Sequence, residues 1–380
     1  MKILEIGSLN VKDGGPPFSM SRQMYGLKAH GIESECLMLP CDENNIIDRN
    51  LKYRYTDDVD FRFLGFAHIP NIRTVFDETS SVDMIHIQNI WTYLTHYAAR
   101  YAREKDIPYV IAPRGSLYHR AMFDKKWFKK QIAWHWYQKK DINHANCIQA
   151  TCLEEMEEIR ALGIKIPVAI IPNSYDSKMI RKGTYMDSTI FKIGYLGRLH
   201  SRKRVEKLIR ALAFLKRHHD NVELWIIGSD DEKYEQFLKG EAIKCKVDDS
   251  VIFTGFLKGE TLDNTIRGCH VFCFPSDFEN WGNVVPDVLV REIPAIASKG
   301  MPWKILEQES CGWWIDTDQN TINKTLLQAY DLGYDELRQM GIRGRKLVES
   351  NFSVEPIGAR LKELYTWILE GGSKPEFVYY

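Results

Sequence analysis

Short apolar runs alternate with longer amphipathic stretches along this chain, and this alternation restricts the possible folds more than any other feature of the sequence. KILEIG, DMIHIQ, YVIAP and CIQAT each precede a stretch with helical character. The first of these stretches, SMSRQMYGLKAHG, is expected to begin with Ser19 or Ser21 as its cap and to end at Gly31. Strands that alternate with helices predict a parallel, doubly wound α/β sheet. A second series begins with FKIGYLG and continues through ELWIIG, VIFTGF, VFCFP and PAIAS. The sequence therefore predicts two doubly wound sheets.

The chain has 380 residues, which is enough for two domains, and a polar segment separates the two series. This segment, SKMIRKGTYMDST, has no apolar periodicity and follows the run VAIIPNSYD. We therefore expect an N-terminal domain at residues 1–175 and a C-terminal domain at 176–355, with a last helix and tail at 356–380.

Charge and composition argue against several classes of protein. Lys plus Arg and Asp plus Glu both number 51, so no overall basic charge points to nucleic acid, and any anion site must be local. The eight cysteines contain no CxxC pair, which favours reduced thiols. No apolar run reaches the roughly 18 residues that span a bilayer, and Glu5 interrupts the apolar core that a signal peptide needs. We expect a cytoplasmic protein.

Ligands of open α/β sheets bind beyond the carboxyl ends of the strands, so the loops after the apolar runs are the places to inspect. The loop RLHSRKR follows FKIGYLG and carries Arg198, Arg202, Lys203 and Arg204 just before a predicted helix. Such a cluster suits a diphosphate that is shared with the helix N-terminus. The alternative is a solvated surface turn.

A second loop, SDFENWGNVVPD, follows VFCFP and carries two acids, Glu279 and Asp287. Pro286 predicts a helix that starts near Asn283 to Val285, and Gly282 allows a close approach of the backbone. A carboxylate accepts two hydroxyl hydrogen bonds, which is how a hexose or a ribose is held. The alternative is that Asp287 only favours a helix start and Glu279 is a surface acid.

The loop NVKDGGPPF after the first strand contains Gly14 and Gly15, which can admit a phosphate or a sugar. Neither a GxGxxG fingerprint nor a Walker motif is present, so a dinucleotide cofactor or a P-loop nucleotide is not supported. Two Asp-x-Asp triplets, Asp58 with Asp60 and Asp316 with Asp318, are interpreted as surface acids rather than metal ligands.

Taken together, these motifs resemble those of the retaining glycosyltransferases of family 4. The acidic pair of that family is similar to ENWGNVVPD followed by VLVREIPAIASKGMPW, and its Gly-Arg with a later Lys is similar to GRLHSRK. The Gly-Gly loop, DMIHIQNIW, APRGSL and IPNSYD add to the resemblance, which covers nearly the whole chain. It implies the GT-B fold, α/β with two doubly wound Rossmann-like domains that face a central cleft. It also implies that the last helix and tail, 356–380, return to the N-terminal domain.

The resemblance also implies roles for individual residues. Arg198 and Lys203 would neutralise the donor diphosphate, Glu279 would bind hydroxyls of the donor sugar, and Asp287 would bind the ribose. The remaining donor-binding residues implied by the resemblance are Gly14, Gly15, Asn280, Trp281, Gly282 and Asn283. The implied donor is a hexose nucleotide, with UDP favoured over GDP, and neither a cofactor nor a metal is expected.

The chain departs from the family pattern at several positions. Asp287 is one methylene shorter than the usual Glu, Ser174 replaces a Gly, and Arg291 with Glu292 stands where small residues are usual. The expected acceptor-side residues are His86, Trp91 and Arg114; Arg114 and Gln88 stand where relatives often have histidines. Asp287 and the displaced histidines keep open a non-catalytic sugar-nucleotide-binding protein as an alternative. A sugar-nucleotide epimerase of the same fold is the other alternative.

The stretch 117–140 is rich in Lys, Arg and aromatic residues. It predicts either an amphipathic helix whose Trp and Phe pack into the domain while its lysines face water, or a patch that contacts an anionic membrane. A glycan or lipid-linked glycan acceptor in surface polysaccharide assembly, which the resemblance implies, is compatible with both. In the second case the protein would be peripheral on the inner face of the cytoplasmic membrane.

Overall fold

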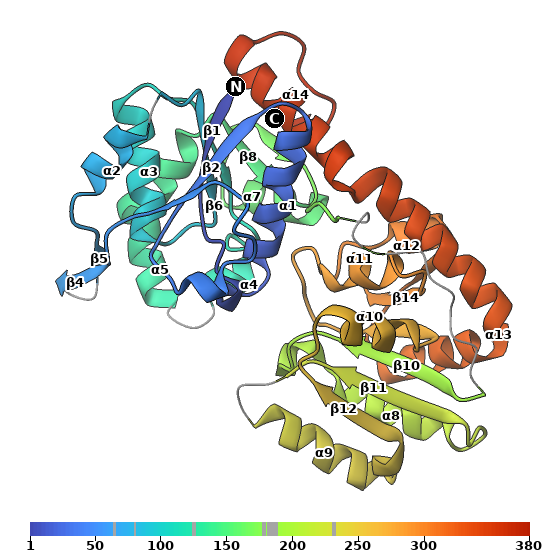
Figure 1. The fold of residues 1–380 in the computed structure, drawn as a ribbon. Helices are drawn as coiled ribbons and strands as arrows, with labels where there is room; N and C mark the ends of the chain where they lie inside the picture. The colour runs from blue at the N-terminus through green and yellow to red at the C-terminus, as the bar shows by residue number, and fades with distance from the viewer. Residues whose placement is uncertain (64–65, 80, 124–126, 177–179, 181–188, 230–232) are drawn as a thin grey trace. The chain divides into compact units, whose positions relative to one another are not determined.

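The computed structural model describes residues 1–63, 66–79, 81–123, 127–176, 180, 189–229 and 233–380. The chain divides into two compact units: unit 1 is Met1–Tyr175 together with Phe352–Tyr380, and unit 2 is Asp176–Asn351 (Figure 1). The chain returns to unit 1 at Phe352, shortly before the predicted residue 356, because the last long helix begins at Val354. The polar segment predicted as a linker lies largely outside the described residues.

Unit 1 is built on one sheet with the strand order β16-β9-β8-β7-β6-β1-β2-β3. Its strands are β1 (Lys2–Ile6), β2 (Glu33–Met38), β3 (Tyr53–Tyr55), β6 (Met84–Gln88), β7 (Tyr109–Ala112), β8 (Cys147–Ala150), β9 (Val168–Ile170) and β16 (Val378–Tyr379). All neighbours pair in parallel except β16, which adds an antiparallel edge to β9 and was not predicted. A hairpin of β4 (Asp60–Phe63) and β5 (Phe66–His68) stands apart from this sheet.

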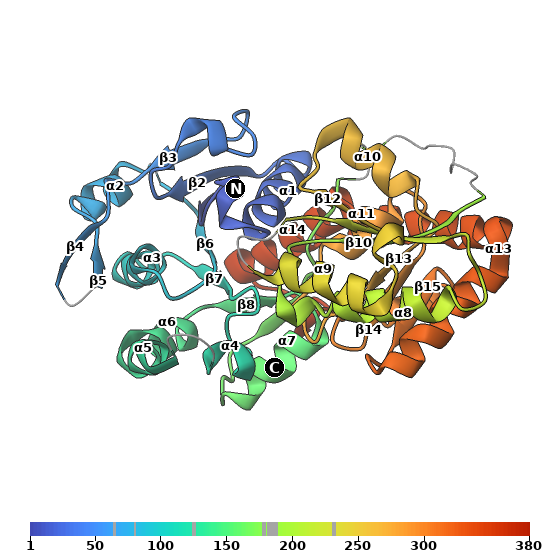
Figure 2. The same cartoon turned by 90° about the horizontal axis from the view of Figure 1, so that it is seen from below.

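Helices cover both faces of this sheet, as parallel sheets require. The helices are α1 (Pro16–Ala29), α2 (Ile72–Glu78), α3 (Tyr93–Glu104), α4 (His119–Met122), α5 (Trp127–Ala133), α6 (Lys139–Asn143), α7 (Leu153–Ala161) and α14 (Val354–Glu370). One apolar core lies under α2, α3, α6 and α7, and another lies under α1 and α14. Figure 2 shows α3, α5 and α6 on one side of the strands and α1 and α14 on the other.

The helix α1 begins earlier than the sequence predicted. Ser19 or Ser21 was expected as its cap, but Gly15 is the N-cap and Pro16 is the first helical residue. The fixed φ of proline is already suited to a first helical turn, where its missing N–H costs no intrahelical hydrogen bond.

Unit 2 contains a six-stranded parallel sheet with the order β12-β11-β10-β13-β14-β15. Its strands are β10 (Phe191–Leu196), β11 (Val222–Ile227), β12 (Val251–Gly255), β13 (Val271–Phe274), β14 (Ala295–Ser298) and β15 (Gly312–Ile315). Its helices are α8 (Glu206–Leu215), α9 (Tyr234–Cys245), α10 (Gly259–Arg267), α11 (Val284–Leu289), α12 (Ile305–Gln308) and α13 (Gln319–Leu347), the last interrupted at Gly333.

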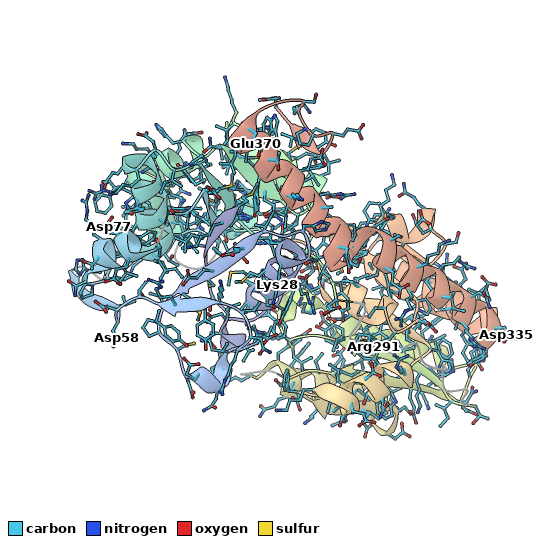
Figure 3. The ribbon with its side chains drawn as sticks, turned by 45° about the horizontal axis from the view of Figure 1, so that its top comes forward. Lys28, Asp58, Asp77, Arg291, Asp335 and Glu370 are labelled. Atoms are coloured by element: carbon cyan, nitrogen blue, oxygen red, sulfur yellow. The ribbon has the colours of Figure 1, made fainter. Side chains whose placement is uncertain are left out.

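The Asp-x-Asp triplets are surface features where the structure describes them. Asp316 pairs with Lys299 at 2.7 Å, and Asp318 caps α13 by accepting from the Thr321 N–H at 3.0 Å. Asp58, labelled in Figure 3, is exposed, while the side chain of Asp60 lies outside the described residues. Among the described residues, no group of three or more His, Cys, Asp and Glu side chains is placed to hold a metal ion.

Candidate active site

Two loops meet where the strand order of unit 2 reverses. The sheet grows in one direction from β10 through β11 and β12, and in the other from β13 through β14 and β15. A doubly wound sheet binds its ligands beyond the carboxyl ends of the strands at such a reversal. The loops that leave β10 and β13 carry the two motifs singled out in the sequence, so the topology brings both to one place.

The ion pair of Lys203 and Glu279 joins the two loops. The Nζ of Lys203 donates to the Oε1 of Glu279, and the two side chains are 22% and 19% exposed. Burial and the Glu279 carboxylate raise the pKa of the nearby Tyr195 well above its usual value, so this phenol stays neutral. Its hydroxyl donates to the backbone carbonyl of Arg198 at 3.1 Å and thereby fixes the first residue of the basic loop.

A second ion pair lies beside the first. Arg204 donates from Nε to the Oδ2 of Asp277 at 2.7 Å, and the backbone N–H of Asp277 donates to the Arg202 carbonyl at 2.9 Å. Arg204 has a left-handed backbone, with φ of 54°, where the short 3-10 turn Ser201–Lys203 ends. No role for Asp277 was predicted, because its partner lies in the other loop and local sequence patterns do not show such pairings.

The structure divides the basic cluster rather than uniting it around one anion. Arg204 pairs with Asp277 and Lys203 pairs with Glu279, whereas the side chains of Arg198 and Arg202 are exposed and form no ion pair with any described residue. The predicted anion at the start of α8 is not favoured, since its first turn carries the buried acid Glu206. The Val205 N–H there already donates to a tyrosine hydroxyl.

The loop after β13 is held against the end of β14. Ser298 donates from Oγ to the Ser276 carbonyl at 2.6 Å, and the Glu279 N–H donates to the Gly300 carbonyl at 2.9 Å. A Cβ on Gly300 would lie 2.4 Å from the Asp277 carbonyl oxygen, so only glycine allows this approach. The backbone at Glu279 is therefore held by the end of β14 and the loop that follows it.

The Trp-Gly pair in this loop faces inward. Trp281 is buried and packs on Trp303 with ring centroids 4.9 Å apart, and the Trp303 indole donates to the Trp281 carbonyl at 2.6 Å. Gly282 has φ of 77°, which a residue with a Cβ adopts only with strain. Asn283 then caps α11, which begins at Val284 as Pro286 predicted.

Asp287 lies in the first turn of α11, and the departures near it are well packed. Arg291, labelled in Figure 3, is buried and donates to the Asp287 carbonyl at 2.6 Å and to Asp263 at 2.9 Å. Burial alone would raise the pKa of Asp263, but hydrogen bonds and charges of Arg267 and Arg291 hold it below its usual value. Arg291, which stands where small residues are usual in the family, is thus accommodated by these hydrogen bonds.

In unit 1 the glycine loop follows β1. Gly14 has φ of 86° at the end of the 3-10 turn Val11–Asp13, and the exposed Gly15 caps α1. The positive φ explains the need for glycine at position 14.

A polar network extends from the interior of unit 1 to the carboxyl end of β7. Glu5 is fully buried and accepts from the amide nitrogens of Gln23 and Gln88, both at 2.9 Å. The Oε1 of Gln88 accepts from Arg114 at 2.7 Å, and the Oε1 of Gln23 accepts from it at 3.1 Å. Asn173, from the motif IPNSYD, also accepts from Arg114. Arg114 is half-buried and forms no ion pair with the described residues.

His86 lies deeper in the same network. Its ring is fully buried, and its Nδ1 contacts the Gln23 amide at 3.0 Å and the Tyr365 hydroxyl of α14 at 2.6 Å. Burial lowers the pKa of His86 to about 3, so the ring is neutral. The ring does not reach the surface of unit 1, so any part of His86 on the acceptor side, which stays a prediction, acts through its neighbours.

Trp91 is half-buried and turned toward the helices that follow β7. Its backbone N–H donates to the Oε1 of Gln138 at 3.1 Å, and its ring centroid lies 6.4 Å from that of Trp134. Its backbone φ is 75°. Trp91 therefore fixes the loop after β6.

Comparison with known proteins decides the family. Residues 176–347 match the family described as Glycosyl transferases group 1, and residues 22–174 match the Glycosyl transferase 4-like domain. The chain belongs to the group 1 glycosyltransferases of the family 4 type. The predicted GT-B fold is confirmed: its two units are the Rossmann-like domains of these transferases.

Among curated relatives of this glycosyltransferase is the GDP-mannose-dependent alpha-mannosyltransferase of Corynebacterium glutamicum, 27% identical over 264 residues. That match covers 65% of this chain and 58% of the relative, and the other curated relatives are matched over smaller shares of their length. Sucrose-phosphate synthase from Thermosynechococcus elongatus has a TM-score of 0.77 at 17% identity, covering 98% of this chain and all of that one. Anabaena Alr3699/HepE in complex with UDP and glucose has a TM-score of 0.75 at 16% identity, with 96% and 99% covered.

Proposed function

We propose that this chain is a retaining hexosyltransferase. It moves a hexose from a nucleotide diphosphate sugar to a glycan or lipid-linked glycan acceptor in surface polysaccharide biosynthesis, and it does so in the cytoplasm. The observation that carries the proposal is the junction of Lys203 and Glu279 at the strand reversal of unit 2. There a cation that suits a diphosphate and an acid that suits sugar hydroxyls lie within one hydrogen bond of each other.

Each donor-side side chain is proposed to bind a different part of the nucleotide sugar. Lys203 and the exposed Arg198 bind the diphosphate, Glu279 accepts hydrogen bonds from the hexose, and Asp287 accepts from the ribose. Lys203 already lies against Glu279, so a bound donor would place its phosphate and its sugar on either side of a preformed contact. Asn280, Trp281, Gly282 and Asn283 supply a backbone that is held rigidly by Trp303 and Gly300.

The transfer we propose keeps the configuration at the anomeric carbon. The bond from C1 to the phosphate oxygen breaks as the acceptor oxygen attacks C1 from the same face. The acceptor proton moves to an oxygen of the leaving diphosphate. Lys203 and Arg198 stabilise the negative charge that develops on this diphosphate, which is the kind of preorganised electrostatic help that lowers a barrier most. No metal is required in this scheme, since the side chains supply the cations.

The acceptor is proposed to approach the carboxyl end of the unit 1 sheet. Arg114 presents a half-buried guanidinium there, held by the amide oxygens of Gln23, Gln88 and Asn173. Gly14 and Gly15 leave room for a phosphate or sugar at the end of β1. His86 and Trp91 act by holding the strand β6 and its following loop in place.

The base of the donor is proposed to be uracil, with guanine as the alternative. The solved Anabaena protein is named in complex with UDP, whereas the corynebacterial relative is named as GDP-mannose-dependent. Calorimetric titration with UDP, GDP and ADP, without added metal, tests the choice. We expect one diphosphate to bind, and Lys203→Ala to abolish the binding while the exposed-lysine control Lys244→Ala retains it. A folded protein that binds none of the three would remove the proposal.

Turnover tests the cationic clamp separately. Arg198→Ala and Lys203→Ala should each lower kcat by at least about a hundredfold, the usual effect of removing one well-aimed donor to a developing oxyanion. The measurement is initial-rate transfer with the donor that the titration selects. Release of epimerised sugar nucleotide without any acceptor would favour the epimerase instead, and tight binding without turnover would favour the non-catalytic protein.

A further inference from the structure

A row of large apolar side chains faces solvent on the helical segment between β7 and β8. Phe128, Ile132 and Trp136 follow one another at intervals of four residues and are 62%, 44% and 68% exposed. This spacing places them on one face of a helix. Phe123 and Trp127 lie next to this row in the chain and are both 51% exposed. We call these five residues the exposed stripe.

The opposite face of the same segment is anchored in unit 1. Trp134 and Gln138 are buried, and Asp141 is held by Arg103 at 2.9 Å and by His96 at 2.6 Å. The segment therefore cannot roll to bury the exposed stripe without breaking these contacts. Of the two interpretations that the sequence left open, inward packing of the aromatic residues holds for Trp134 but not for Trp127, Phe128 or Trp136. In Figure 2, α5 is seen nearly end-on at the outer edge of unit 1.

Basic residues predominate around the exposed stripe, since residues 117–140 contain seven Lys or Arg and one Asp. Lys129, Lys139 and Lys140 are exposed and have no ion pair with any described residue. The described residues of 117–140 include no carboxylate, and the next acid, Asp141, is buried. Two copies of this chain that met through the exposed stripe about a twofold axis would bring lysines against lysines, so a second copy is a poor occupant.

We propose that the exposed stripe inserts into the interfacial layer of an anionic bilayer, with the flanking lysines on the headgroups. Trp is the side chain that best suits the boundary between headgroups and acyl chains, and basic residues beside it favour anionic lipids. The contact is peripheral, and none of the described helices is both long and apolar enough to cross a membrane. The inference rests on the lipid-linked acceptor of the proposed function, whose lipid would lie in the same surface.

Co-sedimentation of the full-length protein with vesicles tests the proposal. We expect it to pellet with phosphatidylcholine vesicles that contain phosphatidylglycerol and to stay in solution with phosphatidylcholine alone. Phe128→Ala with Trp136→Ala should lower the partition coefficient by at least about tenfold, and Lys129→Glu with Lys140→Glu should lower it similarly. The matched control is Phe237→Ala with Ile243→Ala, which removes two exposed apolar side chains from α9 of unit 2, 49% and 64% exposed, and should leave partition unchanged.

Three outcomes would overturn the proposal: no binding to either vesicle, equal binding to both, or binding that the Phe128 and Trp136 changes leave intact. A dimer in sedimentation equilibrium that these two changes convert to a monomer would assign the exposed stripe to a second copy instead. The same samples are titrated with nucleoside diphosphate. Vesicle binding without nucleotide binding would support membrane contact and remove the transferase proposal. Nucleotide binding without vesicle binding would support the transferase proposal and remove membrane contact.

Discussion

Glu5 shows how a single buried acid ties stability to pH. Burial is the main cause that raises its pKa, from 4.5 to about 7, although hydrogen bonds from Gln88 and Gln23 and the charge of Arg114 oppose the shift. The folded chain therefore binds this proton more tightly than the unfolded chain. The stabilisation is complete below about pH 4.5 and is lost as the pH rises through 7.

The unfolding free energy of the wild type, relative to that of Glu5→Gln, should thus fall by up to about 3 kcal/mol between pH 4.5 and 8. Urea unfolding of both proteins across this range measures it. An unchanging difference between the two proteins would show that Glu5 titrates at its ordinary pKa in the folded chain.

At the scale of residues, the sequence indicated which side chains belong to the site better than it indicated which side chains they contact. It singled out Lys203 and Glu279 but did not indicate that they form an ion pair. Glu5 was noted only because it interrupts an apolar run. Asp277 and Gln23 were missed because each acts on a residue far away in the chain, and local spacing does not show such contacts. Interior acids in apolar strands are the one signal that would have pointed to the unit 1 network.

At the scale of elements, α1 and α14 pack through glycine. A Cβ on Gly26 would lie 2.7 Å from the Val354 carbonyl oxygen, and one on Gly358 would lie 2.4 Å from the Gly26 carbonyl oxygen. Backbone atoms cannot move aside as a flexible side chain can, so Gly26→Ala should destabilise the protein by about 1 to 3 kcal/mol. Denaturant unfolding gives the value.

The exposed helical residue Gly240 of α9 is the matched control. No atom lies within 4 Å of a Cβ built there, and alanine forms helix better than glycine, so Gly240→Ala should stabilise by about 1 kcal/mol or less. If both changes stabilised equally, the close approach of the two helices would not exist in solution.

The apolar runs predicted most of the strands, since short buried strands of parallel sheets are apolar throughout. The strands β2, β3, β4, β5, β15 and β16 were missed. β16 has only two residues, and its pairing joins the end of the chain to β9 in the middle of the sequence. The start of α1 was placed too late because serine was weighed above the proline that begins the helix.

At the scale of the whole molecule, the alternating pattern predicted two doubly wound domains, but the completion of unit 1 by the end of the chain came from family resemblance alone. Physically, this completion depends on α14, whose Leu361, Leu364 and Tyr365 are fully buried in unit 1. The Tyr365 hydroxyl also contacts His86 of the central strand β6. Unit 1 therefore lacks part of its core until the last residues are in place.

A chain ending at residue 351 should accordingly leave unit 1 unfolded while unit 2, which is complete at Asn351, keeps its structure. Hydrogen exchange read by mass spectrometry should show native protection in β10 and β13 and loss of protection in β1 and β6. A second truncation, after residue 372, removes β16 but keeps α14, and it should retain protection in β1 and β6 because the buried face of that helix remains. Full protection of β1 in the shorter chain would mean that unit 1 folds without α14. The buried side chains of this helix would then contribute little to the folding of the unit 1 core.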